Sequence, residues 1–306
     1  MKMAFTAKDV AELRKQTGCG MMDCKNALTE SNGDFEAAVK YLREKGMAAT
    51  AKKADRIAAE GIVDILTIDN TTAIVEVNSE TDFVAKNATF QEFVKEILKT
   101  IIANKPADVD ALLASDYVAG GKVSEALAEQ IYKIGEKLSI RRFVIVEGTV
   151  STYIHGMGAT GVVVSFDTDI ADSEAFKECA KNVALQTAAM PVLYLDAASV
   201  PAEVLAEEKA ILIKQMQQDP KMANKPQQVL EKIVEGKVGK YYENNCLLHQ
   251  LYVKDDSMTV AKYVESVAKA NGASIKVTGY VRFDKGEGLE KREEDFAAEI
   301  QKMVQG

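Results

Sequence analysis

The feature that most constrains the fold of this chain is a segment that occurs twice. Residues 60–82 read EGIVDILTIDNTTAIVEVNSETD, and residues 147–169, which begin 87 positions later, read EGTVSTYIHGMGATGVVVSFDTD. The segments align without a gap, and seven of the 23 aligned pairs are identical, including the Thr-Asp that ends each copy. Several identical residues are strand formers, so composition alone accounts for part of the match. We predict a duplicated unit made of a hairpin and a following helix.

The first copy has the clearer hairpin pattern. Strand-forming residues run from Ile62 to Ile68 and from Ala73 to Val77, and Asp69-Asn70 between them is a favourable turn. From Thr89 onward the apolar residues recur with the period of a helix, at Phe90, Phe93, Val94, Ile97, Leu98, Ile101 and Ile102. These patterns predict a strand, a turn, a strand and an amphipathic helix.

The region of the second copy repeats this order. A helical stretch near residues 124–139 precedes it, strand patterns return at 143–153 and 161–166, and a further helix is expected from Ser173.

Before the first copy, the chain reads as three short helices. Thr6, with Asp9 three residues later, is close to a capping box, residues 21–28 suit a second helix, and Asp34 is a good cap for a third. About 40 residues form only a marginal core on their own. Residues 46–61 are rich in Ala and Lys, and we predict that they form a helical linker.

Between residues 201 and 242 the strand patterns disappear. Pro201 and Pro226 stand at the starts of two predicted helices, whose apolar residues suggest an antiparallel pair. The predicted apolar contacts are Val204, Leu205, Ile211, Leu212 and Met216 against Val229, Leu230, Ile233 and Val234. A helix at 257–270, strands at 275–283 and a helix from 289 complete the prediction.

The predicted fold class is therefore α+β, with four parts. They are a three-helix domain with its linker at 1–54, a core subdomain at 55–140, a related subdomain at 141–286 that carries the helical hairpin at about 190–235, and a C-terminal helical module at 287–306. A chain of 306 residues is expected to form about two domains, or three small ones.

Composition limits the partners and the compartment. The net charge of −8 argues against a nucleic-acid-binding surface spread over the whole protein. We find neither a signal peptide nor an apolar run of the roughly 20 residues that span a membrane, and we expect a cytoplasmic protein. The four cysteines and two histidines are a poor set for zinc. A disulfide between Cys19 and Cys24 is an alternative to the free thiols expected in this compartment.

The sequence offers little that indicates catalysis. Gly156, Gly158 and Gly161 have the spacing of a dinucleotide-binding loop, but a strand follows them where that motif needs a helix. We find no phosphate-binding G-x-x-x-x-G-K-[ST] and no G-x-S-x-G. We therefore expect no catalytic residue, no metal and no cofactor, and we retain a metabolic enzyme with an unrecognised site as an alternative.

Two stretches point instead to contact surfaces. We expect one residue of Met21-Met22 to face the small core and the other to be exposed as an adaptable contact for a partner. The alternative is that both fill gaps in the core. Asp82-Phe83 follows a strand in a short connection, where a turn has no need of a Phe. It is either a contact surface or a helix-capping Asp beside a Phe that covers the core.

Two motifs together, LRKQTGCGMMDCKNAL at 13–28 and NSETDFVAK at 78–86, resemble the elongation factor Ts family. The resemblance spans nearly the whole chain and includes Arg141-Arg142 before a strand, the turn Tyr153-x-His155-Gly156 and the ending TGYVRFDKGEGLEKREEDFAAEI. In one place the chain departs from the family. Ala159-Thr160 stands where members often carry Arg-Ile, which puts a charged contact there in doubt.

The resemblance implies a guanine-nucleotide exchange factor for elongation factor Tu, the GTPase that delivers aminoacyl-tRNA to the ribosome. It implies that the three-helix domain, similar to ubiquitin-associated domains, packs on the partner's GTPase domain through Leu13, Arg14, Met21, Met22 and Lys25. It also implies that the corner Thr81, Asp82, Phe83 and Val84 pushes against the partner beside its Mg²⁺ and phosphate site. Further implied contacts are Ile134, Gly135, His155, Ile233 and Val234.

In some members of the family the helical hairpin serves for dimerisation, so a homodimer through this hairpin is one expectation. The main alternative to an exchange factor is a non-enzymatic adapter that binds mainly through its three-helix domain. That alternative predicts that the isolated domain carries most of the affinity, whereas the enzyme alternative predicts turnover of a small molecule without any GTPase.

Overall fold

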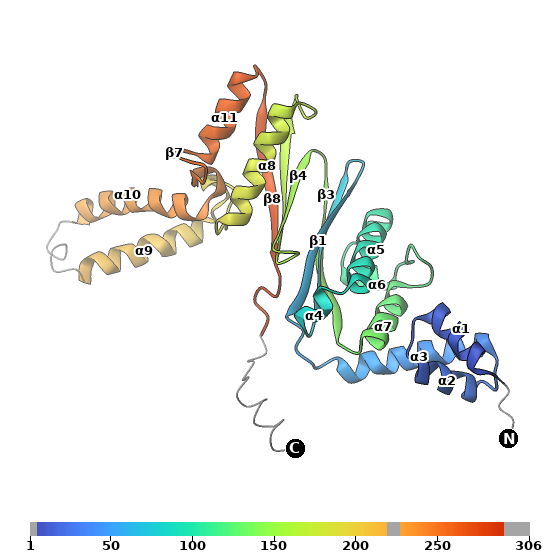
Figure 1. The fold of residues 1–306 in the computed structure, drawn as a ribbon. Helices are drawn as coiled ribbons and strands as arrows, with labels where there is room; N and C mark the ends of the chain where they lie inside the picture. Colours follow the sequence, from blue (N-terminus) through green and yellow to red (C-terminus); the bar gives the residue numbers. More distant parts are fainter. Residues whose placement is uncertain (1–4, 219–226, 291–306) are drawn as a thin grey trace. The chain divides into compact units, whose positions relative to one another are not determined.

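The computed structural model describes residues 5–218 and 227–290 (Figure 1). The chain forms two compact units. Unit 1 comprises the described residues of 1–145, 156–160 and 283–306, and unit 2 comprises those of 146–155 and 161–282. None of the described helices is long and apolar enough to cross a membrane.

Unit 1 begins with three helices, α1 (Ala7–Thr17), α2 (Met21–Glu30) and α3 (Phe35–Lys53). The predicted caps are confirmed. Thr6 and Asp9 form a complete capping box, and the Asp34 carboxylate accepts the Ala37 N–H at 3.0 Å. The helices enclose a small apolar core whose buried residues are Val10, Leu13, Cys19, Cys24, Ala27, Leu28, Ala38 and Leu42.

The Ala/Lys-rich segment differs from the prediction of a linker. It is helical, but as far as Lys53 it is the second half of α3, which packs along α7 (Val123–Ile134). The two helices approach closely at Gly46, where an added Cβ would lie 3.1 Å from the Ala128 carbonyl oxygen. Tyr132 of α7 packs against the core of the three helices. The three-helix domain is thus fixed to α7 rather than tethered, and the predicted boundary at residue 54 stays a prediction.

The first hairpin forms as predicted. Strands β1 (Glu60–Ile68) and β2 (Thr71–Ser79) pair antiparallel, and the turn between them places Asp69 at a φ of 53°. Strand β3 (Leu138–Glu147) lies beside β2, which gives the order β1-β2-β3. The predicted helical stretch at 124–139 was too long, because Gly135 ends α7 with a left-handed φ of 83° and β3 has begun by Leu138.

Helices α4 (Asp82–Ala85), α5 (Ala88–Asn104) and α6 (Val109–Ala114) complete unit 1, and α6 was not predicted. The amphipathic pattern of α5 is confirmed, since its apolar face is buried against the hairpin strands. The buried residues of that face are Phe90, Phe93, Val94, Ile97, Leu98 and Ile101, while Ile102 is partly buried.

A buried carboxylate ties three segments of unit 1 together. Glu76 of β2 is fully buried and accepts hydrogen bonds from Arg141 at 3.0 Å, from Arg142 at 2.6 Å and from the Gly286 N–H at 2.8 Å. Burial alone would raise the pKa of Glu76, but these hydrogen bonds and that of Asn78 lower it below the ordinary value. The Glu76 carboxylate therefore fixes β3 to β2 through Arg141 and Arg142, and it fixes the segment around Gly286 to β2 through a backbone N–H.

In unit 2, strands β4 (Val150–His155), β5 (Thr160–Thr168) and β8 (Ile275–Asp284) form a sheet in the order β4-β5-β8. Helix α8 (Glu174–Ala189) begins at the predicted cap, Ser173. The strand predicted at 143–153 is two strands, because Gly148, with a φ of 100°, separates β3 from β4. The core of this unit lies between the sheet, α8 and α11 (Val260–Ala270).

The helical hairpin of unit 2 consists of α9 (Ala202–Gln218) and α10 (Gln227–Asn245), which lie side by side (Figure 1). Met216, Leu230, Val234 and Val238 are buried between them, but two predicted contact residues, Ile211 and Val229, are exposed. The short elements η1 (Ala197–Ser199), η2 (Leu247–His249), β6 (Leu251–Tyr252) and β7 (Asp255–Thr259) complete this unit. The helix predicted from 289 falls almost entirely outside the described residues.

Candidate functional site

The corner between β2 and α5 exposes an aromatic ring. Helix α4 makes a single turn there, and it buries Val84 and Ala85 against the core of unit 1 while Phe83 points outward. Phe83 leaves 80% of its surface exposed, so the alternative that it covers the core is wrong. The N-cap positions of α4 and α5 are Thr81 and Asn87, so Asp82 is not a helix cap.

Asp82 and Phe83 share a neighbour that sequence reasoning overlooked. Lys86 donates a hydrogen bond to the Asp82 carboxylate at 2.6 Å, and its Nζ lies 6.0 Å from the centre of the Phe83 ring. The hydrogen bond from Lys86 lowers the pKa of Asp82 below its ordinary value. The signal was present in the sequence, because oppositely charged residues four positions apart meet on one face of a helix.

The corner is fixed by hydrogen bonds from outside its own hairpin. The carboxylate of Glu136, which follows Gly135 at the end of α7, accepts the Thr81 N–H at 3.0 Å and the Thr81 hydroxyl at 2.7 Å. Two predicted contact sites, Thr81–Val84 and Ile134-Gly135, are therefore brought together. Ile134 is partly buried against the core, and Gly135 is exposed.

On the three-helix domain, most of the predicted contact residues are exposed. Arg14 and Lys25 are exposed, and Met21 and Met22 leave 45% and 63% of their surfaces exposed. The expectation that one Met faces the core is wrong, because α2 packs through Cys24, Ala27 and Leu28. Leu13 is completely buried and holds the domain together, so it offers no surface of its own.

The remaining predicted residues belong to unit 2. His155 ends β4 and is exposed, with its Nδ1 3.3 Å from the Tyr153 hydroxyl. Ile233 is partly buried and Val234 is buried between α9 and α10. In unit 1, the departure from the family pattern at Ala159-Thr160 has a structural use, because the Thr160 hydroxyl donates to Asp284 at 2.6 Å.

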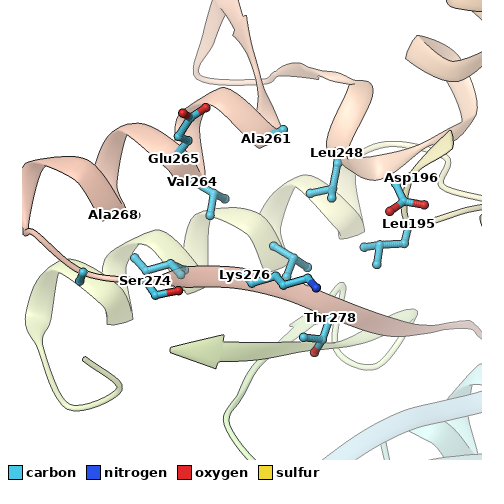
Figure 2. Close-up of a pocket in the computed structure, with 13 residues that line it drawn as sticks. Leu195, Asp196, Leu248, Ala261, Val264, Glu265, Ala268, Ser274, Lys276 and Thr278 are labelled. Atoms are coloured by element: carbon cyan, nitrogen blue, oxygen red, sulfur yellow. The ribbon is translucent and has the colours of Figure 1, made fainter. Parts of the chain in front are cut away.

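Unit 2 contains a pocket (Figure 2). It has a volume of about 520 Å³, lies between α11, β8 and the segment around Leu195, and is lined mainly by aliphatic side chains. Its polar groups include Asp196, Glu265 and Lys276. The Asp196 carboxylate already accepts the N–H and the hydroxyl of Ser199, so it serves as the cap of η1. The groups that line this pocket do not form an acid–base pair that indicates catalysis.

The cysteines do not provide chemistry either. All four are free and buried, so the alternative of a disulfide between Cys19 and Cys24 is wrong. Burial raises the pKa of Cys179 to about 11, which keeps that thiol protonated and unreactive. Among the residues that the structure describes, no three His, Cys, Asp or Glu side chains gather as a metal site would require. The exposed apolar side chains of Phe83, Met21 and Met22 are instead of a kind suited to contact with a partner.

Comparison with known proteins gives a consistent result. The model of the family described as "Elongation factor TS" matches residues 80–287. Elongation factor Ts of Syntrophotalea carbinolica is 46% identical over 306 residues, which cover 99% of this chain and 100% of that protein. Elongation factor Ts of Clostridium kluyveri is 46% identical over 309 residues and 99% of each chain.

Proposed function

Because this chain belongs to the elongation factor Ts family, it is the nucleotide exchange factor of elongation factor Tu, and we propose that it releases GDP by placing Phe83 beside the partner's Mg²⁺ and phosphate site. It acts in translation elongation, in the cytoplasm. The factor makes and breaks no covalent bond, so it is an exchange factor and not an enzyme.

Exchange of this kind depends on a difference in affinity. A GTPase holds GDP through backbone amides at a helix N-terminus and through Mg²⁺, which together surround the phosphates. An exchange protein that binds the nucleotide-free GTPase more tightly than the loaded form lowers the affinity of the GTPase for its nucleotide. By thermodynamic reciprocity, the nucleotide lowers the affinity of the GTPase for the exchange protein to the same extent. The exchange protein therefore needs a surface whose contact with the GTPase disturbs the binding of Mg²⁺ and of the phosphates.

The observation that carries the proposal is the exposure of Phe83 on a corner that is held in place. An aromatic ring offers a large contact area and has few side-chain torsions to restrict. Its exposed fraction of 80% is more than that of either Met21 or Met22. Because Val84 and Ala85 anchor α4 to the core, little further order is required when the ring meets a partner.

The proposal is tested by comparing GDP release in the presence and in the absence of Mg²⁺. Release of fluorescent GDP from elongation factor Tu is measured by stopped flow with the full chain and with Phe83→Ala, each at saturating concentration, first in Mg²⁺ and then in EDTA. We expect the variant to be slower in Mg²⁺ and the difference to shrink in EDTA, where the metal is already gone. An equal difference in both conditions would show that Phe83 does not act through the metal site.

The adapter alternative gives the three-helix domain most of the affinity, and the exposure of Met21 and Met22 favours a contact there. We infer that this domain binds the partner through the exposed face of α2. Replacing both residues by Ala is expected to weaken the complex by roughly 1 to 3 kcal/mol, measured by titration calorimetry. If the isolated domain, residues 1–54, binds as tightly as the full chain, the adapter alternative is correct.

We further propose that the chain is organised as two related core subdomains, 55–140 and 141–286, after an N-terminal domain similar to ubiquitin-associated domains at 1–54 and before a C-terminal module at 287–306. The order β1, β2, α5 is repeated by β4, β5, α8, which supports a duplication. In this scheme the pair α9–α10 is an insertion into the second subdomain. Limited proteolysis with mass mapping checks these boundaries, because cuts are expected near residue 55 and not within β1 or β2.

The same helical pair is proposed to mediate a homodimer. The support is the exposure of two aliphatic side chains on it, Ile211 at 43% and Val229 at 40%. Sedimentation equilibrium of the full chain and of Ile211→Lys tests the proposal. A dimer that the substitution dissociates is expected, and a monomer at all concentrations would contradict it.

A further inference from the structure

Two chain segments that are far apart in sequence exchange hydrogen bonds at the corner that carries Phe83. The Glu136 carboxylate accepts from the Thr81 N–H at 3.0 Å and from the Thr81 hydroxyl at 2.7 Å. In the opposite direction, the Glu80 carboxylate accepts from the Lys137 N–H at 2.6 Å. Residues 80–81 and 136–137 thus hold one another through the side chain of one segment and the backbone of the other, and we call this arrangement the reciprocal clasp.

The side of the clasp that contains Glu136 is firmly placed. Gly135 ends α7 in the left-handed conformation, and its N–H donates to the Ile131 carbonyl at 3.0 Å. Val123, Ala128 and Ile131 bury α7 in unit 1. A residue attached directly to the end of such a helix has little freedom to move, so the Glu136 carboxylate is presented from a fixed base.

The side that contains Thr81 is the last backbone position before the exposed ring. The N–H of Thr81 is at the N-cap of α4, where helix N–H groups lack partners within the helix. Ser79 of β2 donates its hydroxyl to the Thr81 carbonyl at 2.9 Å, so both polar backbone groups of Thr81 are bonded. The direction in which α4 leaves the strand, and with it the direction of Phe83, depends on these bonds.

The position of Glu136 is unfavourable for a helix end taken alone. The C-terminal end of a helix carries partial negative charge, which repels a carboxylate. An acidic residue placed directly after the C-cap glycine is therefore better explained by the bonds it makes to Thr81 than by any benefit to α7. This was the signal in the sequence that could have identified it.

We propose that Glu136 is a positioning residue for the exchange reaction, which acts by fixing the corner so that Phe83 meets the partner in one orientation. The inference rests on the proposed function of Phe83. It assigns Glu136 no contact with the partner, so its whole effect must pass through Phe83.

The test measures GDP release from elongation factor Tu at a saturating concentration of each full-length variant. We expect Glu136→Ala to slow release about tenfold, since a small misplacement of a group that acts by position has a large effect on rate. Glu136→Gln should recover much of the rate, because its amide oxygen can accept the Thr81 N–H. The matched control is Glu174→Ala, which removes an exposed carboxylate that pairs with Lys177 at 2.9 Å and should leave the rate unchanged.

The decisive comparison repeats Glu136→Ala in a chain that already carries Phe83→Ala. No further slowing in that background supports the inference, and a further tenfold slowing overturns it, because Glu136 would then act independently of the ring. If Phe83→Ala is slow while Glu136→Ala matches the wild type, the inference fails and the proposed function stands. If Phe83→Ala itself has no effect, the proposed function fails, and the inference with it.

A second variant protects the test against misfolding. Thr81→Val removes the hydroxyl bond to Glu136 and keeps the backbone bond, so it is expected to slow release less than Glu136→Ala does, and again only when Phe83 is present. Melting temperatures of all variants are measured in parallel. If Glu136→Ala does not fold, the test uses Thr81→Val with Phe83 present and Thr81→Val combined with Phe83→Ala. Slowing of GDP release by Thr81→Val that persists in the Phe83→Ala background overturns the inference.

Discussion

At the corner after β2, Phe83 leaves 80% of its surface exposed, whereas at the matching corner after β5, Ile170 is packed against the core of unit 2. Both corners follow a Val-rich strand and a Thr-Asp pair. The Asp residues are used differently. Asp82 pairs with Lys86 of its own helix, while Asp169 accepts the Ser274 N–H at 2.9 Å and so holds its corner to the start of β8.

Under the role that we propose for Phe83, the difference illustrates how a structural corner can become a contact surface. In the second corner, the Asp and the residue after it both serve the fold. In the first corner, Glu136 holds Thr81 from outside the hairpin, and Val84 packs into the core. Phe83, which lies between Thr81 and Val84, is therefore free to face a partner. In the first corner, unlike the second, the Asp and the residue after it are not the groups that hold the corner to the rest of the unit.

The strands before the two corners also differ in which residues make contacts with other segments. Glu76 of β2 aligns with Val163 of β5, and both are completely buried. Val163 is an ordinary core residue, while Glu76 binds Arg141, Arg142 and the Gly286 N–H. The first copy has therefore taken on a polar connection between segments that the second copy lacks at this position.

The largest expected effect concerns this polar connection. Glu76→Gln removes the charge that two arginines share, and we expect it to lower the free energy of unfolding by about 3 kcal/mol, as for other buried ion pairs that lose one partner. Urea denaturation measures the change. Val163→Thr, which alters the aligned residue without removing a charge, is the control for a polar change in the same strand. An unchanged unfolding midpoint for Glu76→Gln would show that the two strands are equivalent.

The same group predicts a dependence on pH. Because the folded pKa of Glu76 lies below its ordinary value of 4.5, its stabilising effect is complete above that pH and is lost as the pH falls through the folded pKa. Between pH 5 and the acid transition, the wild type should therefore lose more stability than Glu76→Gln, as followed by thermal melts. Parallel curves for the two proteins would contradict the assignment.

The next largest effect is a loss of stability expected from a substitution at the second corner. Ile170→Ala should cost about 2 kcal/mol of unfolding free energy, at the low end for a buried aliphatic side chain because Ile170 is only partly buried. It should leave the rate of GDP release unchanged wherever the protein remains folded. A slower release without any loss of stability would mean that both corners serve the partner.

The smallest effect separates the two aspartates. Asp169→Asn weakens the bond to the Ser274 N–H and should cost up to about 1 kcal/mol, the usual contribution of one hydrogen bond. Asp82→Asn breaks an exposed ion pair and should leave the melting temperature unchanged. Calorimetric melts of the two variants measure the contrast, and equal shifts would remove this part of the comparison.

Much of the fold follows from local patterns. The capping box at Thr6, the turn at Asp69 and the apolar face of α5 each depend on residues within one or two helical turns or one hairpin, and each prediction is confirmed. The errors arose where one glycine ends an element inside an otherwise regular pattern. Gly135 shortens the predicted helix, and Gly148 divides the predicted strand. Helix α6 has six residues, which is too short for periodicity to identify.

The candidate site was predictable in part. The surplus aromatic at Phe83 was visible in the sequence, because a turn has no need of a large apolar side chain. Its exposure was not, since a ring in a turn can equally cover a core. An acidic residue directly after the C-cap glycine marks Glu136 as unusual, but no local pattern specifies its pairing with Thr81, 55 positions away. The outward direction of both Met21 and Met22 also depended on how three helices share one small core.

We propose that the first corner acts on the partner and that the second serves the fold. The most direct measurement is the rate of labelled GDP release from elongation factor Tu at saturating Phe83→Ala and Ile170→Ala, with the melting temperature of each variant. We predict that Phe83→Ala slows release at least about tenfold, equivalent to about 1.4 kcal/mol, with its melting temperature within about 1 °C of the wild type, and that Ile170→Ala does the reverse. Release at the wild-type rate with Phe83→Ala, or equal slowing by both variants with unchanged melting, would contradict the account.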